Sequence, residues 1–126
     1  MNYEIAKFFE EYPSAFSDQG YQEFLYFYAG GLIVRDDFLL HLWGPDQEFA
    51  ENYVWEDVMF DLTHYCPFCC INIGNIKRID YGFAKHLAGV YQATKPAQNK
   101  IRIIRYNDSF SEWLRLVVTD VNKVLK

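Results

Sequence analysis

The sequence predicts an α+β fold: a mostly antiparallel sheet of about four to six strands, flanked by N-terminal helices and one long C-terminal amphipathic helix. Apolar residues recur with helical spacing at both ends of the chain, and short apolar runs separated by turn residues fill the middle. Strand and helix patterns do not alternate as they do in βαβ proteins. The 126 residues are most simply one domain, 1–126.

Two helices are expected at the N-terminal end. Residues 3–12 place apolar side chains at the i, i+3, i+4, i+7 spacing of one helical face, and Pro13 ends that pattern. Residues 14–20 are polar and are expected to form a loop. An aromatic helix is expected over residues 21–28, and the glycine pair at 30–31 stops it because glycine takes positive φ freely.

The middle of the chain is expected to form the sheet. Residues 32–34 and 38–43 are apolar runs on either side of an Asp-Asp turn, and we expect them to pair as a hairpin. A helical segment is expected after Pro45, where acidic residues fill the first turn. Four further runs indicate strands, with turns near 74–75 and over 95–99: residues 66–74, 76–83, 89–94 and 100–106.

The chain ends in a predicted amphipathic helix. Ser109 with Glu112 three residues later is a capping box, in which each side chain satisfies an amide at the helix start. The residues behind this cap line one apolar face: Phe110, Trp113, Leu114, Val117, Val118, Val121 and Leu125.

Charge is distributed unevenly along the chain. Residues 36–76 hold eight acidic side chains and no lysine or arginine, whereas residues 77–126 hold ten basic and four acidic side chains. This asymmetry favours a charged partner, and the alternative is that the two segments neutralise each other in the fold. The net charge of −5 disfavours nucleic acid as that partner. Arg102 and Arg105 are therefore expected on the solvent face of a strand.

The same composition indicates a cytoplasmic protein that does not associate with a membrane. The N-terminus lacks the features of a secretory signal, and no stretch reaches the roughly 18 apolar residues of a membrane span. The three cysteines lie within five positions, which is not a disulfide framework, so their thiols are expected to be free.

The stretch His64-Tyr65-Cys66-Pro67-Phe68-Cys69-Cys70 is the strongest chemical motif. Cys-Pro-Phe-Cys is the form of a dithiol redox site, and a metal site is the other possibility, with candidate ligands His64, Cys66, Cys69 and Cys70. However, no helix pattern comes after the motif to lower a thiol pKa, and structural zinc sites usually combine two distant ligand pairs. Adjacent Cys69 and Cys70 would also point to opposite faces of a strand.

The expectation from these residues is therefore buried cysteines in a core strand, with no cofactor. The sequence contains none of the common motifs for phosphate, nucleophile or zinc-protease chemistry.

Four segments, in order, resemble the SUKH superfamily. "YQEFLYFYAGGLIV" is similar to its helix-to-strand signature, and "FLLHLWGPDQEFAENY" to its next strand and acidic helical turn. "CCINIGN" resembles the strand that ends in an isoleucine-glycine pair, and "DSFSEWLRLVV" resembles the closing helix. The family often continues after that pair with an acid and further glycines, whereas this chain has Asn75-Ile76-Lys77.

The resemblance implies a non-enzymatic, protein-binding domain, and many bacterial members look like immunity proteins that neutralise a secreted toxin, often a nuclease. A nuclease presents cationic surface to phosphates, so clustered carboxylates would steer and select it. Alternatives are a thiol or metal protein and an interaction scaffold without a toxin partner. The oligomeric state is left open. The candidate partner-binding residues are Asp36, Asp37, Asp46, Glu48, Glu51, Tyr53, Trp55, Glu56, Asp57 and Asp61.

Overall fold

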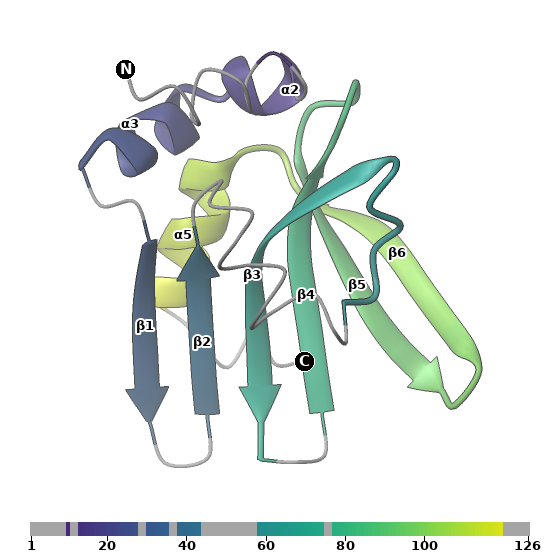
Figure 1. The fold of residues 1–126 in the computed structure, drawn as a ribbon. Coiled ribbons are helices and arrows are strands. Elements are labelled where there is room, and N and C mark those ends of the chain that lie inside the picture. The colour runs from purple at the N-terminus through teal and green to yellow at the C-terminus, as the bar shows by residue number, and fades with distance from the viewer. Residues whose placement is uncertain are drawn as a thin grey trace.

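The computed structural model describes residues 10, 13–27, 30–35, 38–43, 58–74 and 77–119. They form an α+β fold with a six-stranded sheet in which sequential strands are neighbours and every pairing is antiparallel (Figure 1). The strands are β1 (Gly30–Arg35), β2 (Phe38–Trp43), β3 (Tyr65–Ile73), β4 (Lys77–Ala84), β5 (Val90–Ala97) and β6 (Lys100–Asn107). Among the described residues, no helix is long and apolar enough to cross a bilayer.

All six runs that were predicted as strands are strands, and the expected hairpin of β1 with β2 is present. Gly74 follows β3 with φ of +57°, a conformation that favours glycine and suits the expected turn into β4. The turn expected over 95–99 is shorter than predicted, because β5 continues to Ala97. The β5–β6 register shifts between Thr94 and Ala97, and such a bulge tolerates Pro96 inside a strand.

The helices differ from the prediction in their starts. The segment predicted as a loop contains a short helix, α2 (Pro13–Phe16), because proline fits the first position of a helix. The next helix, α3 (Gln19–Phe27), begins two residues earlier than predicted. Its cap is Asp18, whose Oδ1 accepts a hydrogen bond from the backbone N–H of Tyr21 at 3.1 Å.

The C-terminal helix, α5 (Phe110–Thr119), starts where the capping motif placed it. The hydroxyl of Ser109 accepts a hydrogen bond from the Glu112 N–H at 3.2 Å. The predicted continuation of this helix to Leu125 lies outside the described residues. The same holds for the helix predicted over residues 3–12, apart from Glu10, and for the helical segment predicted after Pro45.

The starts of α3 and α5 lie against each other. Asp18 Oδ2 also accepts a hydrogen bond from the Phe110 N–H at 2.8 Å, so one carboxylate caps both helices. A Cβ on Gly20 would collide with Ser111 Oγ, so the absence of a side chain at Gly20 permits this close approach. Two elements about ninety residues apart are thereby fixed together.

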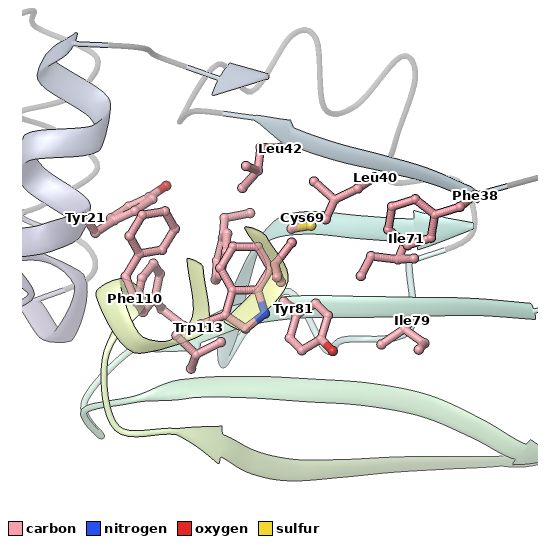
Figure 2. Packing of buried hydrophobic residues seen from close by; sticks show 14 residues of the cluster. Tyr21, Phe38, Leu40, Leu42, Cys69, Ile71, Ile79, Tyr81, Phe110 and Trp113 are labelled. Atoms are coloured by element: carbon pink, nitrogen blue, oxygen red, sulfur yellow. The ribbon is translucent and has the colours of Figure 1, made fainter. Parts of the chain in front are cut away.

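The core fills the space between α3, α5 and one face of the sheet (Figure 2). Trp113 is fully buried and lies edge-on to Phe68, with ring centroids 4.9 Å apart, and beside Tyr81 at 5.2 Å. Tyr21 contacts Phe83 at 4.6 Å. The cluster comprises Tyr21, Phe38, Leu40, Leu42, Phe68, Cys69, Ile71, Ile79, Tyr81, Phe83, Val90, Phe110, Trp113 and Val117.

Candidate functional site

Nine of the ten candidate partner-binding residues lie outside the part of the chain that the structure describes. These are Asp36, Asp37, Asp46, Glu48, Glu51, Tyr53, Trp55, Glu56 and Asp57. Asp61 is described, and its side chain is 55% exposed in the turn before β3. The site predicted from the acidic segment therefore has one structurally described member.

Asp61 organises its own turn. Its carboxylate accepts a hydrogen bond from the Thr63 N–H at 2.9 Å and lies 2.5 Å from the ring Nδ1 of His64. The hydrogen bond to His64, followed by that to Thr63, lowers the pKa of Asp61. Asp61 consequently presents a negative charge at the surface over the whole range near neutral pH.

The three cysteines lie in β3 but in different surroundings. Cys69 is fully buried in the core cluster, and Cys70, the next residue, is buried on the opposite face of the sheet. Cys66 is half-buried and lies before a register shift between Pro67 and Cys69. No cysteine is in a disulfide.

Burial makes the two deeper thiols poor nucleophiles. Loss of hydration raises the pKa of Cys69 well above its ordinary value, and burial raises the pKa of Cys70 to about 11 despite the nearby Arg78 guanidinium. The motif leads into more strand, not into a helix whose N-terminus could stabilise a thiolate. This setting resembles that of structural cysteines and not that of a redox dithiol.

The fold does not assemble the candidate metal ligands. His64 is on the exposed turn, whereas Cys69 and Cys70 are buried on opposite faces of β3. Within the described ranges, which include all four candidates, no group of three or more histidine, cysteine, aspartate or glutamate side chains is placed to hold a metal ion.

An ion pair with a fully buried carboxylate and a partly exposed guanidinium lies on the face of the sheet opposite the core cluster. Asp80 is fully buried, and its carboxylate accepts a hydrogen bond from Arg78 Nε at 2.7 Å and from the Met59 N–H at 2.8 Å. Cys70 is opposite Asp80 in the β3–β4 register, and Asn72 Nδ2 lies 3.8 Å from Cys70 Sγ. Charge-assisted bonds from two directions offset the cost of burying this carboxylate.

Sequence reasoning missed the burial of this pair, although one signal for it was present. In β4 the apolar and polar residues alternate, so Arg78 and Asp80 share a face. The alternation does not predict which segment covers this face. The segment around Met59 and Phe60 lies over it, and Phe60 is 4% exposed.

Arg102 and Arg105 are both exposed, as expected. Arg105 is held by the carbonyl of Ala88 at 2.9 Å and by the Asp108 carboxylate at 2.6 Å. Arg102 lies three positions before Arg105 in β6, so the two side chains point to opposite faces of the sheet. The two arginines therefore belong to different surfaces.

No family model, curated protein or solved structure matches this chain.

Proposed function

We propose that this chain is a non-enzymatic, SUKH-type protein-binding domain of the cytoplasm, an immunity protein that neutralises a cognate polymorphic or contact-dependent toxin by covering its cationic surface. The toxin domain is often a nuclease in such systems, and its basic surface is the chemistry that the acidic segment 36–76 would recognise.

One observation carries the proposal: all four segments that resemble the family contribute to one contiguous core. The first contributes Tyr21, the second Leu42, the third Ile71 and the fourth Phe110 and Trp113, all within the same cluster. Chance matches of short strings need not meet in space. That these segments pack together in chain order supports their interpretation as parts of one shared fold.

The binding step is driven by charge. An inhibitor rich in carboxylates accelerates its encounter with a basic domain and selects it over neutral proteins. Tyr53 and Trp55 are the aromatic residues within that segment that are suited to anchor the complex, because Trp and Tyr dominate interface hot spots. Asp61, exposed and ionised, is the last acidic residue of the same segment.

The test is association with the toxin domain encoded beside this gene, measured by biolayer interferometry at 50 and 300 mM salt. The variant Asp46→Asn/Glu48→Gln/Glu51→Gln should slow association about tenfold at low salt, since charge steering acts on the rate of encounter. Trp55→Ala should raise Kd about thirtyfold, the size of a hot-spot loss of about 2 kcal/mol.

The matched control is Glu23→Gln/Asp108→Asn/Glu112→Gln, which removes three exposed acidic charges outside residues 36–76. Its association rate should stay close to that of the wild type. Equal slowing by both triple variants would show that net charge, and not the acidic segment, sets the association rate. No binding of the wild-type chain at 50 mM salt would refute the proposal.

A further inference from the structure

The sheet opens between β4 and β5. These eight-residue strands pair over only three residues each, Asp80 to Gly82 with Tyr91 to Ala93. Below that point the β5–β6 hairpin swings away from β4 (Figure 1). The start of β4 and the end of β5 therefore form two separate walls within one sheet.

A cleft of about 1060 Å³ occupies this opening. Its size is slightly above the range of about 300–1000 Å³ that is typical of small-molecule sites. The residues that line it come from both walls, from the segment before β3 and from the end of β3: Val58, Met59, Asn72, Gly74, Lys77, Arg78, Gln92, Thr94, Lys95, Pro96, Ile101, Arg102, Ile104 and Tyr106.

The lining is cationic. Lys77 and Arg78 come from the β4 wall, Lys95 and Arg102 come from the β5–β6 wall, and no acidic side chain is among the described lining residues. Three of these cations are exposed, and the fourth, Arg78, is held in place by the buried Asp80 carboxylate at 2.7 Å. Positive charge on facing walls raises the local concentration of anions between them.

The rest of the lining suits a ligand with an uncharged body. Val58, Met59, Ile101 and Ile104 contribute apolar side chains from both faces of the sheet, and Asn72, Gln92 and Thr94 contribute hydrogen-bonding groups. A bare anion would use only the cations.

We propose that this cleft binds a small phosphate ester with several adjacent negative charges and an apolar or aromatic body, a nucleoside polyphosphate. The phosphates contact Lys77, Lys95 and Arg102, and the base lies against the apolar side chains. Binding of such a ligand is separate from the proposed toxin neutralisation, and the experiment that tests it requires no toxin.

Two other anionic partners fit the cleft less well. A nucleic-acid strand needs a basic track that extends over the surface, whereas this chain has a net charge of −5 and gathers four cations in one opening. An acidic peptide added as a strand needs continuous backbone donors, and the β5 wall carries Pro96, which has no N–H, and a register shift.

The experiment is isothermal titration of the full chain with ATP in low-salt buffer containing EDTA, with inorganic phosphate, an oligothymidylate and an oligoglutamate as the other probes. ATP should bind most tightly, and Lys95→Gln/Arg102→Gln should weaken it at least about tenfold, because two charge-assisted contacts are lost. Both substituted side chains are exposed, so the fold should persist.

The matched control is Lys85→Gln/Arg115→Gln, which removes two cations that do not line the cleft and should leave ATP binding unchanged. Four results would overturn the proposal: no binding of ATP at millimolar concentration, equal weakening in both double variants, inorganic phosphate binding as tightly as ATP, and tighter binding of the oligothymidylate or the oligoglutamate.

Discussion

The two faces of the sheet bury side chains of opposite character. On one face, α3 and α5 cover aromatic and aliphatic residues, with Trp113 at the centre. On the other, the segment around Met59 covers a carboxylate that is bonded to Arg78 and to a backbone amide. Packing on the first face is non-directional, whereas the bonds of Asp80 require one particular partner position.

This difference assigns different roles to the two faces. Apolar burial supplies most of the free energy of folding, while a buried ion pair is weak as a source of stability and costly to break. Asp80 holds the segment around Met59 against this face of the sheet, because its Oδ2 accepts a hydrogen bond from the Met59 N–H. Substitutions on the two faces should therefore differ in size and in kind.

The largest effect is expected on the apolar face. Trp113→Ala should lower the free energy of unfolding by about 3–5 kcal/mol, since it leaves a cavity among Phe68, Tyr81 and Phe110. Val118→Ala on the same helix, where the side chain is 65% exposed, should change it by less than about 0.5 kcal/mol. Urea unfolding measures both, and similar costs for the two would refute the placement of the core.

The second effect tests the polar face. Asp80→Ala should cost about 3 kcal/mol in urea unfolding, because it removes a buried acceptor that both the Arg78 guanidinium and the Met59 amide use. Asp108→Ala is the control, since it also removes an aspartate from an arginine pair, but both partners are exposed. That variant should cost below about 1 kcal/mol. Equal costs would show that burial of Asp80 does not matter.

The smallest effect compares the faces at adjacent residues. Cys69→Ser places a hydroxyl in the apolar cluster and should cost about 2 kcal/mol. Cys70→Ser places it beside Asn72 and Asp80, where it can form hydrogen bonds, and should cost below about 1 kcal/mol. Urea unfolding measures the loss of unfolding free energy in both variants, and a larger loss for Cys70→Ser would contradict the assignment of the two faces.

Much of the fold was predictable because local patterns report it. The strands coincide with apolar runs bounded by turn residues, and the start of α5 is set by Ser109. The helix start at Gln19 was missed, since Asp18 lies in a polar stretch that resembles a loop and its capping role emerges only once α3 forms. The burial of Asp80 was missed because it depends on a segment about twenty residues away, and no local pattern encodes such a contact.

The candidate site was less predictable than the fold. The split between β4 and β5 gives no sequence signal, since both strands read as continuous runs. The cations Lys77, Lys95 and Arg102 look like ordinary solvent-facing residues until the divergence of the strands places them on facing walls. Surface chemistry of this kind is a property of the tertiary structure.

The shared carboxylate of Asp18 makes the two helix starts a single cooperative unit. Tyr21 and Phe110 donate their amides to its two oxygens, so the cap of α3 also holds the start of α5. Release of either helix exposes the cap of the other, and the two amides should exchange with solvent through one opening event. Two helix starts that lie about ninety residues apart in sequence should therefore lose their protection from exchange together.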